Sequence, residues 1–175
     1  MLLDRENASS RLREKLTSLL NEWQETGVPP RHEMESAAVE LLQWKNSQGI
    51  ESLWDNPPLM VTATLDDGLG LGLRLIHQYA EVAGLRVKSL GLFLTPEKIV
   101  EECRSLVPDI LGMTVLQFTS EEALAYVAQN LPDKTQLIAG GQVLAVDPDL
   151  ADRIGVHFVA KNAAEFLGYL LSLDN

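Results

Sequence analysis

Five short apolar runs, each followed by residues with helical spacing, constrain the fold of this chain more than any other feature. The runs cover residues 59–64, 86–93, 109–115, 136–139 and 156–160. Helical periods follow at 71–83, 96–106, 120–130 and 163–173, with a short helical turn after Asp147 and Pro148. Strands that alternate with crossover helices are typical of a parallel sheet. The sequence therefore predicts an α/β domain with a five-stranded parallel sheet of flavodoxin-like (Rossmann-like) type and helices on both faces.

Several of the predicted helices begin at residues that suit a helix N-terminus. Thr95 and Asp147 each precede a proline, which favours a capping oxygen followed by proline at the first helical position. Thr119 and Asn162 each stand three residues before a glutamate, which is the spacing of a capping box or a close variant. These starts support the predicted order of strands and helices.

The first 56 residues follow a different pattern from the rest of the chain. Apolar residues recur at helical spacing over 9–26 and again over 31–46, with a glycine and proline break between them. Two helices of this size cannot enclose a core, so their apolar stripes need the rest of the chain or a second copy of it. We expect a helical segment at 1–56 and an α/β domain at 57–175. A homodimer through the helical hairpin is one arrangement that would satisfy this pattern.

The charge balance narrows the classes of partner. The chain has 14 basic and 25 acidic residues, for a formal charge of −11. Such a surface repels nucleic acid backbones and anionic lipid headgroups. No apolar run approaches the ~20 residues of a membrane span, and the N-terminus turns charged before a signal peptide could form. We therefore expect a cytoplasmic protein that binds neither nucleic acid nor membrane.

The single cysteine, Cys103, lies within a predicted helix. One thiol excludes an internal disulfide, a paired-thiol zinc site and a CxxC redox motif. Its acidic neighbours, Glu101 and Glu102, should raise the thiol pKa. The sequence therefore predicts a structural role for Cys103.

Ligands of a doubly wound sheet bind beyond the carboxyl ends of its strands. The loops to search are therefore 66–72, 116–120 and 140–143, which follow the first, third and fourth predicted strands. The first of these loops carries Gly68, Gly70 and Gly72, which would let a large ligand lie against bare backbone. A glycine-rich turn is also an ordinary way to build a tight corner between a strand and a helix.

The residues of these loops do not fit the familiar phosphate chemistries. A dinucleotide fingerprint needs a third glycine where this chain has Leu73 or Leu75, and the Gly-Lys-Ser/Thr of a phosphate loop is missing. Asp66 and Asp67 could mimic the acidic pair of a phosphoacceptor receiver. Such a domain needs an aspartate at the end of the third strand, where this sequence has Thr114, and threonine cannot form an acyl phosphate.

Taken together, the three loops resemble the signature of cobalamin-binding domains of the methionine synthase and methylmalonyl-CoA mutase kind. The family pattern is Asp-x-His-x-x-Gly, then Ser-x-Leu, then Gly-Gly. This chain has Asp67 through Gly72, then Thr114 through Leu116, then Gly140 and Gly141. The resemblance keeps the family's order and covers about residues 59–173.

The resemblance implies that the chain binds cobalamin, with the corrin over the carboxyl ends of the sheet and the nucleotide tail in a channel beside it. The first-loop glycines would let the tail approach the backbone, Thr114 would stand for the serine near the tail, and the glycine pair would flank the channel. The implied binding residues are Asp67, Gly68, Leu69, Gly70, Gly72, Thr114, Leu116, Gly140 and Gly141.

The sequence departs from the family pattern at the position of the histidine that ligates cobalt from below. Leu69 stands there, and a leucine side chain cannot donate to a metal. Three outcomes stay open: a corrinoid with its own base or with no lower ligand from the protein, a different flat macrocycle, or no ligand. Haem, which sensor relatives of the family bind, would need a histidine elsewhere. His32, His77 and His157 each read more simply as surface or core residues, and His32 is the one to test.

No arrangement of residues predicts catalysis by this chain. The acidic pairs read as solvated helix faces, and no Ser-His-Asp or Cys-His set can be argued. The expected function is a corrinoid carrier or sensor that meets a methyltransferase, a mutase subunit or a regulator. The alternative is a haem-binding or cofactor-free regulatory module that binds another protein.

Overall fold

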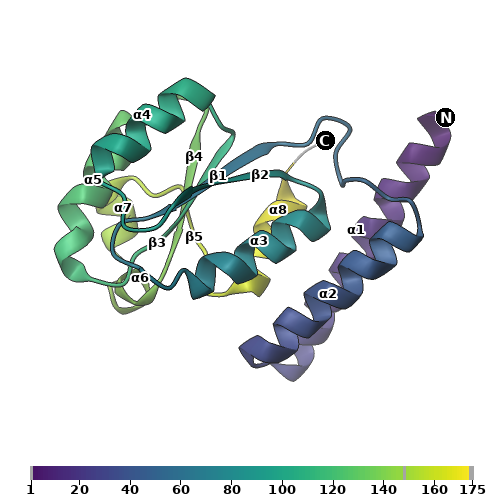
Figure 1. Ribbon diagram of the computed structural model, residues 1–175. Helices are drawn as coiled ribbons and strands as arrows, with labels where there is room; N and C mark the ends of the chain where they lie inside the picture. The colour runs from purple at the N-terminus through teal and green to yellow at the C-terminus, as the bar shows by residue number, and fades with distance from the viewer. Residues whose placement is uncertain (1, 148, 174–175) are drawn as a thin grey trace. The chain divides into compact units, whose positions relative to one another are not determined.

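The computed structural model describes residues 2–147 and 149–173, with side chains from residue 7 onward. Five strands are present: β1 (Leu59–Thr64), β2 (Arg86–Gly91), β3 (Ile110–Thr114), β4 (Gln136–Gly140) and β5 (Phe158–Val159). The helices are α1 (Leu2–Thr26), α2 (Arg31–Ser47), α3 (Leu71–Ala83), α4 (Pro96–Leu106), α5 (Glu121–Asn130), α6 (Gln142–Val146), α7 (Leu150–Ile154) and α8 (Ala163–Ser172), with a 3₁₀ turn, η1 (Phe118–Ser120) (Figure 1). Within the described ranges, no helix has both the length and the apolar character needed to cross a membrane.

The strands form one parallel sheet in the order β2-β1-β3-β4-β5, which confirms the predicted flavodoxin-like fold. Thr64, at the end of β1, lies opposite Thr114 at the end of β3. Thr114 in turn lies opposite Gly140 at the end of β4. The register therefore brings the loops after β1, β3 and β4 to one edge of the sheet, as strand-end reasoning predicts.

Contacts divide the chain into two compact units. The first combines the residues up to Pro57 with Leu75–Arg86 and the chain from Asn162 onward. The second consists of Pro58–Arg74 and Val87–Lys161, and it contains almost the whole sheet. The predicted boundary between a helical segment at 1–56 and an α/β domain at 57–175 stays a prediction.

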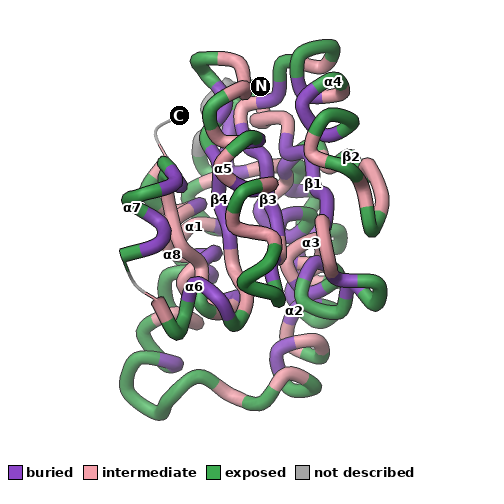
Figure 2. Tube along the Cα trace, turned by 90° about the vertical axis from the view of Figure 1, so that its left-hand side faces the viewer, coloured by how far each residue is buried: buried purple, intermediate pink, exposed green. Residues whose placement is uncertain are grey.

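The core of the second unit lies between the sheet and the helices α4, α5, α6 and α7. Strands β1, β3 and β4 are buried along most of their length (Figure 2). Alternate residues of these strands pack on the helices, which is the period of two that a strand imposes. The cluster includes Val61, Ala63, Leu111, Met113, Leu137 and Ala139 from the strands, with Ile99, Cys103, Leu124, Val127, Leu144 and Leu150 from the helices.

In the first unit, the helices α1 and α2 pack against parts of their own chain. The guanidinium of Arg13 on α1 donates a 2.6 Å hydrogen bond to the carbonyl oxygen of Leu171 on α8. The hydroxyl of Tyr79 on α3 donates to the carbonyl oxygen of Met34 on α2 at 2.8 Å, and its ring meets Trp23 edge-on at 5.9 Å. The apolar stripes of the hairpin are therefore covered without a second copy of the chain.

Several element boundaries differ from those predicted. Helix α1 begins at Leu2, before its apolar period is visible, because residues 4–11 are mostly polar. Helix α6 was not predicted, since five residues are too few to show a helical period. Strand β5 has two residues where 156–160 was predicted.

The predicted helix starts have mixed outcomes. The Thr95 hydroxyl accepts from the Lys98 amide at 3.3 Å, and the Asn162 side chain accepts from the Glu165 amide at 2.9 Å, so both caps are confirmed. The cap at Thr119 is wrong, because η1 precedes α5 and Ser120 occupies the N-cap position without a side-chain cap bond. Pro148, part of the start predicted at Asp147, lies outside the described residues, and α7 begins at Leu150.

Cys103 is fully buried on α4. Burial and the nearby Glu102 raise the pKa of its thiol to about 11. Because the thiolate is the reactive form, we expect native protein to react with Ellman's reagent at pH 8 roughly 100-fold more slowly than protein unfolded in urea. Equal rates for the two forms would show that Cys103 is accessible and reactive.

Candidate functional site

The loop after β1 is organised by Asp67, which is almost fully buried. Its Oδ1 atom accepts hydrogen bonds from the backbone amides of Leu69 and Gly70, both at 2.9 Å. Gly70 has φ 60°, a left-handed conformation that suits glycine. Asp67 thus orders its own loop, a function that requires no histidine. The Leu69 side chain is left 77% exposed.

The three glycines of this loop have different surroundings. A Cβ atom added to Gly68 would lie 2.2 Å from Cε2 of Phe93, and one added to Gly70 would lie 2.9 Å from Cδ2 of Leu92. A Cβ atom on Gly72 would meet only the Thr114 hydroxyl oxygen, at 3.7 Å. The structure therefore places the protein's own side chains against Gly68 and Gly70, whereas Gly72 is exposed and an added Cβ there would make only an ordinary contact.

Phe93 and Leu92 come from the loop after β2. Thr64 holds this loop: its hydroxyl accepts from the Phe93 amide at 3.1 Å, and its carbonyl oxygen accepts from the Leu94 amide at 2.9 Å. The same hydroxyl donates to the Asp67 carbonyl oxygen at 2.6 Å. Phe93 has φ 55°, which is uncommon for a bulky residue. The loops after β1 and β2 are therefore locked together through Thr64.

The glycine pair after β4 is packed against backbone. The Val115 amide donates to the Gly140 carbonyl oxygen at 2.9 Å. A Cβ atom on Gly141 would lie 2.1 Å from the Val115 carbonyl oxygen, and one on Gly140 would lie 2.6 Å from the Ala160 carbonyl oxygen. These glycines admit neighbouring backbone segments of the same chain.

Asp66 connects the loop after β1 to the loop after β3. One carboxylate oxygen accepts from the Leu116 amide at 2.9 Å. The other accepts from the Gln117 amide at 2.9 Å and from the Ser120 hydroxyl at 2.7 Å. The sequence drew attention to Asp66 only as half of an acidic pair. Its hydrogen-bond partners lie 50 to 54 residues further along the chain, so no local sequence pattern indicates them.

Large apolar side chains are exposed along this edge. Six of the eleven exposed large hydrophobic residues among the described side chains lie in the loops after β1, β2 and β3 or at the start of α3. We call them the apolar rim: Leu69, Leu71, Leu92, Phe93, Leu116 and Phe118. Exposed apolar groups gathered at one place mark a surface that binds something. Sequence reasoning missed Leu92 and Phe93, because it considered only the loops after the first, third and fourth predicted strands.

The histidines do not add a metal ligand to this edge within the second unit. His157 precedes β5, and its Nδ1 atom accepts from the amide of Leu137 near the start of β4. That end of β4 is roughly 10 Å from its carboxyl end, at about 3.3 Å per residue. His32 and His77 belong to the first unit, where burial lowers the pKa of His77 against an opposing effect of Glu81. Among the residues described, no cluster of three His, Cys, Asp or Glu residues could hold a metal ion.

Comparison with known protein families shows which family the chain belongs to. The family model described as the B12 binding domain matches residues 58–167. The chain belongs to the B12 binding domain family. The predicted resemblance is thereby confirmed, and the family supports cobalamin as the cofactor.

Solved structures with the same fold include cobalamin and corrinoid proteins. A cobalamin-binding protein from Desulfitobacterium hafniense superposes with TM-score 0.75 at 20% identity, over 97% of this chain and 84% of that one. The monomethylamine corrinoid protein of Methanosarcina barkeri gives 0.61 at 24%, over 79% and 64%. The methanol:cobalamin methyltransferase complex of the same organism gives 0.64 at 17%, over 98% and 70%. No curated protein matches the chain.

As a B12 binding domain, the second unit fits a corrinoid in some respects and departs from the family in one. The apolar rim suits the flat apolar face of a macrocycle, and the exposed Gly72 adjoins the Thr114 hydroxyl. Leu69 offers no donor atom to cobalt. The residues therefore fit a corrinoid that takes no lower ligand from the first loop.

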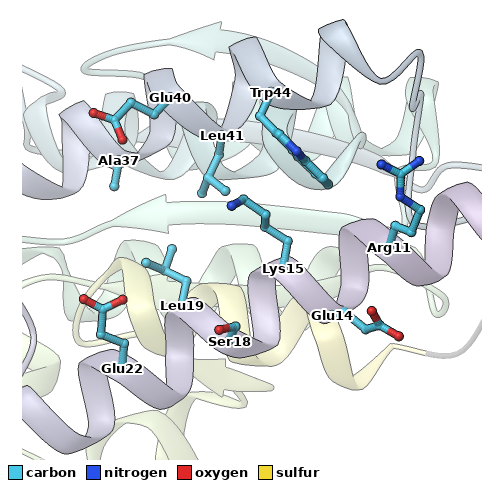
Figure 3. Close-up of a pocket in the computed structure, with 10 residues that line it drawn as sticks. All are labelled: Arg11, Glu14, Lys15, Ser18, Leu19, Glu22, Ala37, Glu40, Leu41 and Trp44. Carbon is cyan, nitrogen blue, oxygen red and sulfur yellow. The ribbon is translucent and has the colours of Figure 1, made fainter.

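A groove of about 700 Å³ lies elsewhere, between α1 and α2 of the first unit (Figure 3). Lys15 and Trp44 line one part of this groove, and the Lys15 ammonium lies 5.3 Å from the centre of the Trp44 ring. Glu22 and Glu40 line its opposite part (Figure 3). Its charged lining distinguishes it from the apolar rim, so it does not resemble a slot for a macrocycle.

Proposed function

We propose that this B12 binding domain is a corrinoid-binding module, acting as a carrier or a sensor, that holds cobalamin without a histidine from the protein beneath the cobalt. The apolar rim carries this proposal, because it lies at the edge where ligands of such sheets bind. Leu69 lies on that rim where the family has its ligating imidazole. A flat apolar ligand would cover side chains that are otherwise exposed to water.

Each group of loop residues has its own role in this proposal. The apolar rim would contact the macrocycle, while Thr114 and the exposed Gly72 would receive its polar tail. Asp67 would fix the backbone that carries Leu69. The remaining predicted residues, Gly68, Gly70, Gly140 and Gly141, would shape the loops without touching the tail. When bound, cobalamin supplies a cobalt atom that can carry an alkyl group.

The proposal concerns binding, with any chemistry on the cofactor assigned to a separate protein. Similarity in fold to a methanol:cobalamin methyltransferase complex supports a protein partner of this kind. We propose a methyltransferase for a carrier, or a regulator for a sensor. A homodimer stays a prediction, and packing of α1 and α2 on their own chain removes the need for it.

Haem is the alternative macrocycle. Haem would need a histidine of this chain as its axial ligand. The one histidine of the second unit, His157, accepts a backbone hydrogen bond at the amino end of β4. The geometry therefore favours a corrinoid over haem at the apolar rim.

The direct test is retention of pigment by the purified protein. The protein is mixed with hydroxocobalamin, methylcobalamin or haemin, desalted, and its absorbance spectrum is recorded. We expect a corrinoid band after mixing with either cobalamin and no haem band. Loss of both cobalamins on desalting, together with no binding in equilibrium dialysis, would reject the proposed function.

The variant Leu69→His tests where the cobalt lies. If Leu69 is beneath the cobalt, an imidazole there should shift the absorbance of bound cobalamin and add a nitrogen coupling to the electron paramagnetic resonance spectrum of its cobalt(II) form. The variant Leu116→His is the control, because it places an imidazole elsewhere on the apolar rim. Identical spectra for the wild type and Leu69→His would contradict this position.

A further inference from the structure

Asp66 lies one residue before the acid of the family motif, and its side chain reaches out of its own loop. All three of its hydrogen bonds go to the segment 116–120 after β3. The two amide donors belong to consecutive residues, Leu116 and Gln117, and each donates to a different carboxylate oxygen of Asp66. This segment follows the last residue of β3 and leads through η1 into α5.

The segment that Asp66 holds carries two residues of the apolar rim. Leu116 is 37% exposed and Phe118 is 55% exposed, so packing covers each side chain only in part. Hydrogen bonds to a charged acceptor are stronger than neutral ones. The Asp66 carboxylate therefore supplies the order that burial does not.

We propose that Asp66 is a positioning residue that holds Leu116 and Phe118 in place for the corrinoid. This inference rests on the proposed function and adds a residue outside the family motif. A ligand that meets an ordered surface does not spend binding free energy on ordering it. Asp66 would thus raise corrinoid affinity without touching the corrinoid.

Asp109 provides a matched control at the opposite edge of the sheet. Its Oδ2 atom accepts from the Leu59 amide at the start of β1 at 2.8 Å, and its Oδ1 atom accepts from the Lys134 ammonium at 2.9 Å. Like Asp66, it joins backbone segments that are far apart in sequence through a carboxylate. It lies at the amino ends of the strands, away from the apolar rim.

The test compares Asp66→Asn with Asp109→Asn in the full chain. An amide keeps the size of the side chain but has one acceptor oxygen, and its NH₂ group would face an amide donor. Affinity for hydroxocobalamin is measured by equilibrium dialysis, and stability by urea unfolding. We expect Asp66→Asn to weaken affinity about tenfold, equivalent to roughly 1.4 kcal/mol. Asp109→Asn should lose stability yet keep affinity within about twofold.

A double-mutant cycle shows whether Asp66 acts through the rim residue it positions. In a Phe118→Ala background, Asp66→Asn should weaken affinity less than it does in the wild type, since one positioned group is already missing. Equal affinity losses for the Asp66 and Asp109 variants would overturn the proposal. Unchanged affinity in Asp66→Asn would overturn it while leaving the proposed function intact, because the wild type would still bind. A wild type that binds no corrinoid would reject the function itself.

Discussion

Gly141→Ala will lower the free energy of unfolding by at least about 3 kcal/mol, measured by urea unfolding. Gly141 has φ 115° and ψ 171°, a backbone region that is essentially restricted to glycine. The new methyl group would also lie 2.1 Å from the Val115 carbonyl oxygen, which is backbone and cannot turn aside. The loop after β3 would have to move, at the cost of the bond from Val115 to Gly140.

Gly155→Ala is the control for this substitution. Gly155 also has a positive φ, 91°, but its added Cβ would meet nothing within 4 Å. The free energy of unfolding of Gly155→Ala should therefore fall by only about 1 kcal/mol, from the unfavourable backbone conformation alone. If the two variants lost equal stability, the close approach of Val115 to Gly141 would have no energetic weight.

Gly72→Trp will weaken cobalamin binding by at least about 100-fold while leaving the fold intact. Gly72 is exposed and has no positive φ, and an added Cβ would make only an ordinary 3.7 Å contact with the Thr114 hydroxyl oxygen. Residues other than glycine are favoured in helices, so the free energy of unfolding should change by less than about 1 kcal/mol. An indole group at this point would fill the space that we assign to the nucleotide tail.

The second ligand in this experiment is cobinamide, a corrinoid without the nucleotide. Its affinity should fall less than tenfold in Gly72→Trp, because it has no tail to exclude. Gly72→Ala serves as the size control and should bind both corrinoids as the wild type does. Equal losses for cobalamin and cobinamide would place the tail elsewhere.

The sheet could be predicted from the sequence because the pattern that indicates its strands and helices is local and repeated. Each buried strand is a short apolar run, each crossover helix has a visible period, and the handedness of crossovers leaves few strand orders. Caps at Thr95 and Asn162 were predicted for the same reason, since donor and acceptor are three residues apart. The cap at Thr119 failed because a 3₁₀ turn precedes α5, and the neighbouring Ser120 donates its hydroxyl to the distant Asp66.

The site was less predictable, because its contacts join residues that are far apart along the chain. The family motif and the strand-end rule both predicted a site at one edge of the sheet, yet the reason for each glycine needed coordinates. Gly68 accommodates the ring of Phe93, which lies 25 positions further along, and Gly141 accommodates the backbone of Val115. No spacing rule relates such positions. The sequence singled out Asp67 only in an acidic pair and in the family motif, so the hydrogen bonds that it accepts from the Leu69 and Gly70 amides were not predicted.

The pairing of α1 with α8 limits how this protein can be shortened for laboratory use. The segment matched by the family model, 58–167, omits α1 and α2 and stops inside α8. A recombinant fragment with those limits would uncover the face of α3 on which Trp23 and Met34 rest, and it would lack Leu171, the α8 residue that Arg13 contacts. Such a fragment would expose apolar surface and aggregate. The helical pair at the start of the chain should therefore be retained in any expressed version of this cobalamin module.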